Sequence, residues 1–245
     1  MQERQGVNQL TIRDLGDTAL SVELGDNIDT ELIARVHAFD AAFNQLQITG
    51  VIETVPTYRG TTVFVDPLVA DIHEIKATIQ RLATIHDHPR PAGQLWEVPV
   101  TYGKEFGHDL EDVAAHANLT PGDLEEAHAA PVYLVAMVGF LPGFSYLSGL
   151  DQRISMPRRS EPRSSIPASS ISIGGQQTAI GSLEGPSGWH VIGRTPARPF
   201  QSGRQPEFLF KPGDRIKFRP ISAREWSMLD RDAARGALIA KCIQG

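Results

Sequence analysis

The chain has 245 residues, of which 41% are hydrophobic and 21% are charged, a balance typical of globular proteins. Its formal net charge of −6 argues against a nucleic-acid-binding protein, and no apolar run approaches the roughly 18 residues of a membrane helix. The first residues lack the apolar core of a signal peptide, and the single cysteine, Cys242, excludes a disulfide framework. We therefore expect a cytoplasmic protein with no nucleic-acid or membrane partner.

Residues 1–90 are expected to form a small α+β domain. Apolar residues recur at strand spacing in four segments and at helical spacing in two, in the order ββαββα. This order indicates a sandwich with a sheet on one side and helices on the other. The strands are expected at residues 9–14, 19–24, 50–56 and 61–65, and the helices at residues 28–46 and about 71–86.

A linker is expected at residues 88–93, where proline and glycine interrupt every periodic pattern. His86 and His88 at this linker have the spacing of metal ligands. No further ligand cluster accompanies them, so we interpret them as solvated side chains and expect no metal site.

Residues 94–245 are expected to form a second, β-rich domain that ends in a helix. From residue 139 to residue 220, glycine, proline and serine separate many short apolar runs, which is typical of a β-barrel or a β-sandwich. Thr120 and Ser222 precede helical patterns as N-caps. Strands are expected at residues 95–101, 131–138 and 215–219, and helices at residues 109–117, 121–128 and 222–243.

Positive charge is concentrated in this second domain. Residues 153–219 contain 11 Lys or Arg against 4 Asp or Glu, although the whole chain is acidic. Such a segment suits an anionic small ligand with a carboxylate or a phosphate group. The alternative interpretation is that these arginines are solvated loop charges.

Two familiar motifs are incomplete. Ser145 lies in a run like that of a hydrolase nucleophile elbow, but the second glycine is missing and no strand-to-helix turn is predicted there. The pair Gly174 and Gly175 lacks the Lys-Ser/Thr of a phosphate-binding loop. We therefore expect neither a serine nucleophile nor a nucleotide loop at these positions.

Three segments combine residues that folding alone does not require together. Residues 139–150 display aromatic rings on a glycine- and proline-rich loop. Residues 156–163 hold arginines in proline-rich extended backbone, and arginine suits carboxylate or phosphate. Residues 172–196 contain two glutamines, which offer amide donors and acceptors, and a Trp-His pair that offers an apolar wall and a titratable group.

These segments resemble the family shared by the B subunit of 5-oxoprolinase, allophanate hydrolase subunit 1 and a bacterial sporulation-kinase inhibitor, which is the carboxyltransferase domain, subdomain C and D. The matching runs are Gly-Phe-Leu-Pro-Gly-Phe-Ser-Tyr-Leu-Ser-Gly-Leu at 139–150, the arginines at 157–163, and residues 167–179 and 188–196. Tyr102-Gly103, Asp109-Leu110 and His128 upstream also match. The chain departs from the family pattern at Ser145, Ser169, Ala179 and residues 181–182. These positions determine the conformation of the loops rather than supply functional side chains.

The resemblance implies an α+β chain in which the N-terminal ββαββα sandwich, residues 1–90, is followed by a cyclophilin-like β-barrel, residues 94–245, with a C-terminal helix. It implies the B subunit of an ATP-dependent 5-oxoprolinase that opens 5-oxo-L-proline to L-glutamate with a homologous C subunit and an A subunit. The ATP site is expected to be shared with a partner subunit or to lie on one. Two alternatives stay open: a regulatory protein that inhibits a sensor histidine kinase, and a carboxyltransferase module acting with biotin.

The resemblance also carries expected roles for the polar and aromatic residues. We expect anion binding by arginines, orientation of the lactam by glutamines, proton transfer by a histidine, and a pocket wall of aromatic rings. The expected residues are Arg158, Arg163 and Arg194 for anions, Gln176 and Gln177 for the lactam, His128 or His190 for the proton, and Phe144, Tyr146 and Trp189 for the wall.

Overall fold

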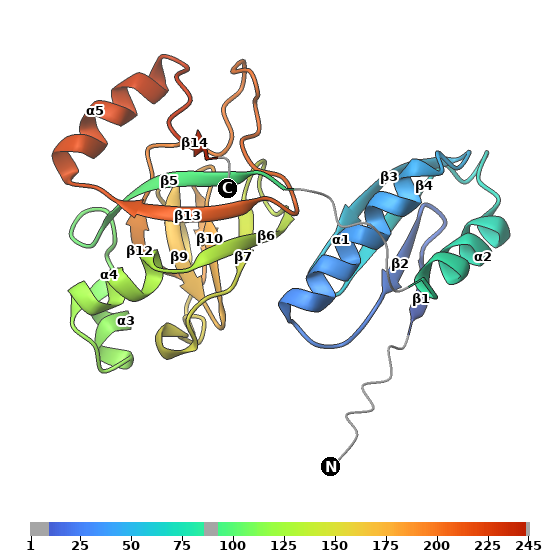
Figure 1. Ribbon diagram of the computed structural model, residues 1–245, viewed down its shortest axis with the longest axis horizontal. Coiled ribbons are helices and arrows are strands. Elements are labelled where there is room, and N and C mark those ends of the chain that lie inside the picture. The colour runs from blue at the N-terminus through green and yellow to red at the C-terminus, as the bar shows by residue number, and fades with distance from the viewer. Residues whose placement is uncertain (1–9, 86–92, 244–245) are drawn as a thin grey trace, which may run out of the picture. The chain divides into compact units, whose positions relative to one another are not determined.

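The computed structural model describes residues 10–85 and 93–243. The chain divides into two compact units, Met1–Ala92 and Gly93–Gly245. Figure 1 shows the first as a sheet with helices α1 and α2, and the second as a barrel with helices α3, α4 and α5. The expected fold class, an α+β chain with a ββαββα sandwich followed by a cyclophilin-like β-barrel, is confirmed. His86, His88 and most of the expected linker lie outside the described residues.

The first unit is a four-stranded antiparallel sheet of order β1-β2-β4-β3 packed against two helices. Val36, Phe39 and Phe43 of α1 lie in one buried cluster with Ile75 and Ile79 of α2, because helical spacing places each set on one side of its helix. Its elements are β1 (Thr11–Leu15), β2 (Ala19–Glu23), α1 (Thr30–Gln45), β3 (Val51–Pro56), β4 (Gly60–Val65) and α2 (Ile72–Ala83).

The second unit is a closed seven-stranded barrel of order β12-β9-β10-β7-β6-β13-β5, in which β12 also pairs with β5. Its elements are β5 (Leu95–Tyr102), α3 (Leu110–His116), α4 (Pro121–Ala129), β6 (Val132–Val138), β7 (Ser145–Ser148), the 3-10 helix η1 (Gln152–Ile154), β8 (Arg163–Ile166), β9 (Ser170–Gly174), β10 (Gln177–Ile180), β11 (Gly185–Ser187), β12 (His190–Arg194), β13 (Arg215–Pro220), α5 (Ala223–Ala234) and β14 (Lys241–Cys242).

Successive side chains along each strand point alternately into and out of the barrel, and apolar side chains fill its interior. Leu147 of β7, Ile173 of β9 and Ile180 of β10 are fully buried in one cluster, together with Val98 of β5 and Ile216 of β13. The β5–β13 pair is parallel, and the other strand pairs of the barrel are antiparallel. The short strands β8 and β11 pair with each other outside the barrel.

The caps that were expected for α4 and α5 are present, but the expected length of the last helix is wrong. Thr120 accepts a hydrogen bond from the Asp123 amide, and Ser222 accepts one from the Glu225 amide. The helix expected at 222–243 ends at Ala234, because Gly236 adopts a left-handed φ of 90°. The amide of Gly236 donates to the Ala233 carbonyl, which closes the last turn.

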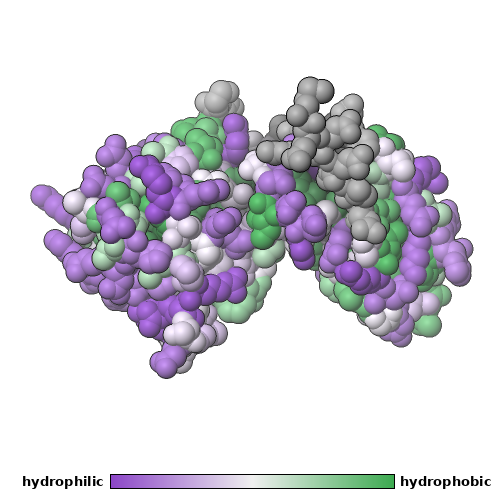
Figure 2. Space-filling model, turned by 90° about the horizontal axis from the view of Figure 1, so that it is seen from below, coloured by the Kyte–Doolittle hydropathy of each residue, from purple (hydrophilic) through white to green (hydrophobic). Residues whose placement is uncertain are grey.

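On the face of the molecule seen in Figure 2, hydrophilic residues cover most of the surface of each unit and apolar residues form separate small patches. Within the described ranges, no helix is long and apolar enough to span a bilayer.

Candidate functional site

A cluster of aromatic rings covers the outer face of the barrel beside β7 and β10. Tyr146 of β7 lies opposite Ala179 of β10, and both point away from the barrel interior, which Leu147 and Thr178 occupy. The ring centroids of Phe144 and Tyr146 are 4.7 Å apart, and those of Tyr146 and Trp189 are 5.9 Å apart. We call Phe144, Tyr146 and Trp189 the aromatic platform; they are the three residues expected to form a pocket wall.

The Trp189 ring lies directly on the backbone of Gly174, at the end of β9. A Cβ atom at position 174 would be only 2.4 Å from the indole ring, so a side chain there would displace Trp189. Gln177 of β10 is the register partner of Gly174, and partners in an antiparallel pair direct their side chains to the same face. Gln177 therefore flanks the platform, whereas Gln176 lies exposed in the tight turn between β9 and β10.

Arg158 supplies the positive charge of the platform. Its guanidinium carbon lies 5.3 Å from the centroid of the Trp189 ring, a cation–π distance. Arg158 is exposed, and its guanidinium makes no hydrogen bond or ion pair with any residue that the structure describes. Burial raises the pKa of Tyr146, and the nearby Arg158 charge partly opposes this rise. The guanidinium of Arg158 is therefore available to a ligand anion.

The segment that carries Arg158 is fixed on both sides by backbone hydrogen bonds to the barrel domain. Met156 and Gly175 exchange backbone hydrogen bonds of 3.2 and 2.7 Å, and the Arg159 amide donates to the Gly188 carbonyl at 2.8 Å. Between these two contacts, Nε2 of His190 lies 2.9 Å from the Pro157 carbonyl oxygen. His190 is 6% exposed, and its Nδ1 atom is buried with no partner among the described residues.

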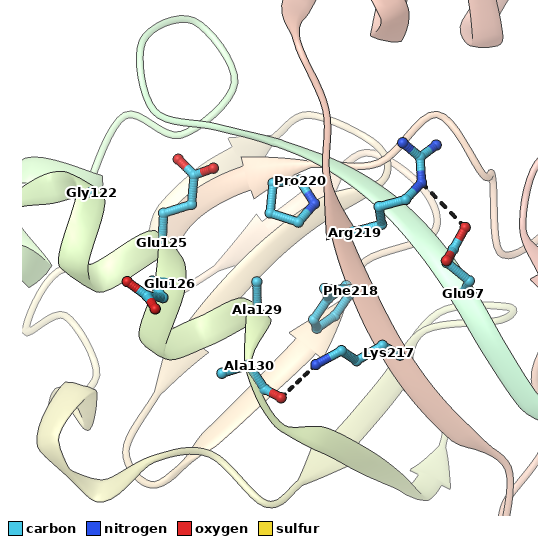
Figure 3. Close-up of a pocket in the computed structure, with 10 residues that line it drawn as sticks. All are labelled: Glu97, Gly122, Glu125, Glu126, Ala129, Ala130, Lys217, Phe218, Arg219 and Pro220. Atoms are coloured by element: carbon cyan, nitrogen blue, oxygen red, sulfur yellow. Dashed lines mark hydrogen bonds and ion pairs between the residues drawn. The ribbon is translucent and has the colours of Figure 1, made fainter.

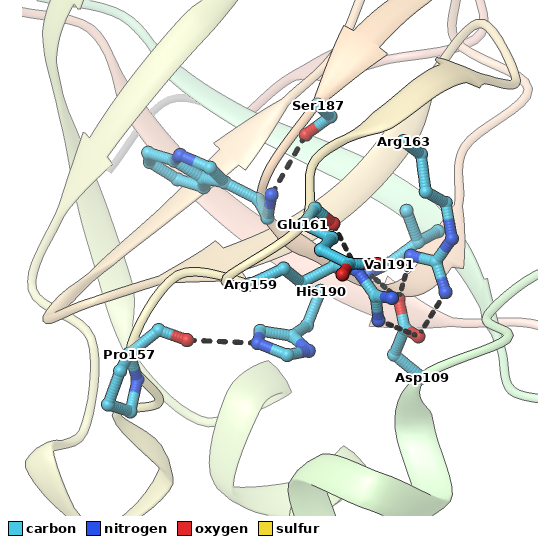
Figure 4. Close-up of polar contacts among 9 residues, drawn as sticks. Asp109, Pro157, Arg159, Glu161, Arg163, Ser187, His190 and Val191 are labelled. Atoms are coloured by element: carbon cyan, nitrogen blue, oxygen red, sulfur yellow. Dashed lines mark hydrogen bonds and ion pairs between the residues drawn. The ribbon is translucent and has the colours of Figure 1, made fainter.

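Asp109, at the N-terminus of α3, is a buried anchor that the candidates drawn from the sequence did not include. Its side chain accepts two hydrogen bonds from Arg163, at 2.7 and 2.6 Å, and one from the Val191 amide at 2.7 Å, and Arg159 lies 3.6 Å away (Figure 4). Burial alone would raise the pKa of Asp109, but the hydrogen bonds and charge of Arg163 hold it below its usual value. Arg163 therefore binds a carboxylate of its own chain.

Arg194 is also engaged within the chain. Its Nε and Nη2 atoms donate to the Ala168 carbonyl at 3.2 and 3.1 Å, and its guanidinium carbon lies 5.3 Å from the Trp226 ring centroid. Burial lowers its pKa from the ordinary arginine value. Three arginines are expected to bind anions. Among the described residues, Arg163 and Arg194 have hydrogen-bond acceptors, whereas the Arg158 guanidinium has neither a hydrogen-bond acceptor nor an ion-pair partner.

His128 lies in the barrel interior and is fully buried. Its Nδ1 lies 2.8 Å from the Tyr102 hydroxyl and its Nε2 lies 2.9 Å from the Thr178 hydroxyl, and its ring stacks on Phe218 with centroids 4.9 Å apart. Burial lowers its pKa from 6.5 to about 3, so the ring is neutral at physiological pH. The structure does not bring His128 to the surface on which Arg158 lies.

Residues 10–210 match the family described as carboxyltransferase domain, subdomain C and D. The chain is 36% identical over 226 residues to the B subunit of 5-oxoprolinase from Bacillus subtilis, covering 88% of this chain and 94% of that protein. The chain belongs to the family of 5-oxoprolinase B subunits.

Solved structures agree with this membership. The conserved uncharacterized protein PH0987 from Pyrococcus horikoshii is 40% identical, with a TM-score of 0.54 over 88% of this chain and 100% of that one. The K. lactis urea amidolyase structure superposes with a TM-score of 0.79 over 98% of this chain and 16% of that one. At 16% identity, the second likeness concerns the fold alone.

A groove of about 540 Å³ lies at a different place on the barrel unit, between α4 and β13 (Figure 3). Three glutamates, a lysine and an arginine line it, but Arg219 pairs with Glu97 at 3.2 Å and Lys217 donates to the Ala130 carbonyl. Burial raises the pKa of Glu125 in its wall. None of the site residues expected from the sequence lines this groove.

The residues that sequence reasoning missed are those that organise the site. Asp109 was noted only as a position that matches the family, because its partner Arg163 lies 54 positions later in the chain. Gly174 lies in a segment that the sequence singles out, at residues 172–196, but no local pattern indicates that the Trp189 ring lies on it. Within the described residues, no group of three or more His, Cys, Asp or Glu could hold a metal ion.

Proposed function

We propose that this chain is the B subunit of a cytoplasmic, ATP-dependent 5-oxoprolinase, which opens 5-oxo-L-proline to L-glutamate together with C and A subunits. The observation that carries the proposal is the similarity, along most of both chains, to a protein named as the B subunit of 5-oxoprolinase. That name denotes one component of an assembly, so the proposal includes partner subunits.

The geometry of the platform supports a small planar ring that bears a carboxylate. Tyr146 and Trp189 pack edge to face, with ring centroids 5.9 Å apart, and form an apolar surface that Gln177 flanks with an amide able to meet a lactam. The Arg158 guanidinium lies over Trp189 with no hydrogen-bond or ion-pair partner among the described residues, and arginine pairs well with carboxylates. We therefore assign substrate binding to Arg158, Gln177 and the aromatic platform.

ATP belongs to this proposal because the opening of an unstrained five-membered lactam is unfavourable; phosphorylation of the amide oxygen would give a good electrophile. The residues of this chain fit the organic substrate better than a nucleotide. Trp189 covers the Gly174 backbone, and Arg163 and Arg194 are engaged within the chain. We therefore assign the ATP-binding groups to a partner subunit, or to a site shared with one.

The test is 5-oxoproline-dependent ATP turnover by the chain co-expressed with C and A subunits, with glutamate release measured in parallel. Arg158→Ala should raise the KM for 5-oxoproline by about tenfold or more, since it removes a charge-assisted hydrogen-bond donor. Arg153→Ala is the matched control, because Arg153 is exposed in the same charged region and pairs with Asp151. It should leave KM unchanged.

Two results would overturn the proposal. An intact assembly whose ATP turnover is the same with and without 5-oxoproline would rule out the enzymatic function. Wild-type kinetics in an intact Arg158→Ala assembly would rule out the assigned site.

A further inference from the structure

His190 lies between the two ends of the segment that carries Arg158. Its Nε2 contacts the carbonyl oxygen of Pro157, the residue immediately before Arg158, at 2.9 Å. A carbonyl oxygen is only an acceptor, so Nε2 carries the proton and donates. The residue before His190 is Trp189, on whose ring the Arg158 guanidinium lies.

The dipeptide Trp189-His190 therefore holds the loop from two directions. The Trp189 ring supports the Arg158 side chain, and the His190 ring holds the backbone that leads into it. The position of the dipeptide is itself fixed, because the next amide, that of Val191, donates to buried Asp109 at 2.7 Å. Asp109 is in turn held by the two hydrogen bonds from Arg163.

We propose that His190 is a positioning residue that holds Arg158 over Trp189 by donating a hydrogen bond to the Pro157 carbonyl. The proposal rests on the proposed function in that Arg158 binds the substrate carboxylate. It gives His190 a role other than proton transfer: Nε2 is occupied by a backbone carbonyl, and Nδ1 is buried rather than open to a ligand.

The charged groups around the ring favour this role. Figure 4 shows His190 beside the Asp109 carboxylate, which is already hydrogen-bonded to Arg163 and lies near Arg159. The negative charge of Asp109 is therefore paired with Arg163 and lies near Arg159. The His190 ring is thus left to donate from Nε2 to the Pro157 carbonyl.

The first test uses limited tryptic proteolysis of the full chain, without substrate or partners. Mass spectrometry compares cleavage after Arg158 and Arg159 with cleavage after Arg153, which precedes the fixed segment. His190→Phe should raise the relative cleavage after Arg158 and Arg159 by about tenfold, because it removes one hydrogen bond that keeps the segment closed. His190→Gln places an amide donor near the position of Nε2 and should stay close to wild type.

The second test uses the kinetics of the assembly. His190→Phe should raise the KM for 5-oxoproline by about tenfold with kcat reduced less than threefold, and His190→Gln should restore KM. Both variants should keep the wild-type pH profile. Circular dichroism and tryptophan emission confirm that each variant is folded.

Either of two results would overturn the positioning role. One is unchanged cleavage in a folded His190→Phe variant. The other is an equal loss of kcat in His190→Gln and His190→Phe, with KM unchanged and the acid limb of the pH profile lost, which would identify a proton carrier. If wild-type assemblies show no dependence on 5-oxoproline, the proposed function fails, whereas the proteolysis result still decides whether His190 positions the loop.

Discussion

His128 and Thr178 meet inside the barrel, with Nε2 of the histidine 2.9 Å from Oγ1 of the threonine. The Thr178 hydroxyl donates its proton to the Ser172 carbonyl at 2.9 Å, so its oxygen accepts from His128. His128 is therefore protonated on Nε2, and its Nδ1 accepts from the Tyr102 hydroxyl at 2.8 Å. These hydrogen bonds link β5, α4, β10 and β9 across the core with every group neutral.

Thr178→Val should destabilise the barrel by about 1–3 kcal/mol, because it keeps the shape of the side chain but leaves the buried Nε2 proton of His128 without an acceptor. Tryptophan emission during urea unfolding measures this unit, since all three tryptophans of the chain, Trp96, Trp189 and Trp226, lie in it. Thr178→Ser retains the hydroxyl and should recover most of the loss. A Thr178→Val variant as stable as wild type would contradict the hydrogen-bond chain.

The barrel should lose stability in mild acid because of His128. Its pKa is about 3 in the folded protein against an ordinary value of 6.5, so the unfolded chain binds more protons between these values. Stability should therefore fall as pH drops through 6.5 toward 3, by at most about 1.4 kcal/mol per pH unit from this group.

The measurement is urea unfolding at pH 7 and pH 5, with His128→Gln as the comparison. The neighbouring hydroxyls of Tyr102 and Tyr133 do not titrate in this range, because an ordinary tyrosine pKa lies well above it and burial raises the pKa of both further. Subtracting the pH dependence of His128→Gln from that of wild type isolates the histidine. Equal pH dependence in the two proteins would show that His128 is not held neutral.

Asp109→Asn should destabilise the barrel by about 2–4 kcal/mol. The amide would leave the Arg163 guanidinium without its buried counter-charge and weaken the acceptor for the Val191 amide. Asp151→Asn is the control, because the Asp151–Arg153 pair is at the surface, with 69% of the arginine side chain exposed. An exposed pair contributes about 1 kcal/mol or less. Equal losses in the two variants would contradict the anchoring role of Asp109.

Gly174→Ala should separate Trp189 from β9. The new Cβ would be 2.4 Å from the indole ring, so the ring must move and the support of Arg158 is lost. We expect a red shift in tryptophan emission, a destabilisation of about 1–3 kcal/mol and a raised KM for 5-oxoproline. Gly122→Ala adds the same methyl group 3.9 Å from the nearest atom and should change none of these. Unchanged emission in Gly174→Ala would contradict the close packing.

Much of the fold follows from local patterns in the sequence. The helical stripes of α1 and α2, the cap at Thr120 and the strand alternation of β13 each depend on residues a few positions apart. The end of α5 was missed because one residue, Gly236, takes a conformation that the surrounding helical pattern does not indicate. Closure of the barrel came from the family resemblance, because the pairing of β12 with β5 joins residues about 90 positions apart.

The candidate site was predictable as a set of residues but not as a set of contacts. The excess of arginines at 153–219 indicated anion binding, but four of these arginines pair with carboxylates that lie outside that segment. The pairs are Arg153 with Asp151, Arg159 and Arg163 with Asp109, and Arg198 with Asp230. Charge counted along the chain cannot reveal such pairing. His128 and His190 likewise cannot be distinguished by residue type. Only the fold shows that His128 contacts Thr178 in the core and that His190 contacts the backbone of a surface loop at Pro157.

The parallel pairing of β5 with β13 sets an order for folding during synthesis. Leu95 pairs with Arg215 and Val100 with Pro220, so the barrel cannot close until about residue 220 has left the ribosome. The sandwich is complete by Ala83 and can form long before then. Until β13 arrives, β5 and β6 each have an unpaired edge, which can pair with a strand of another chain.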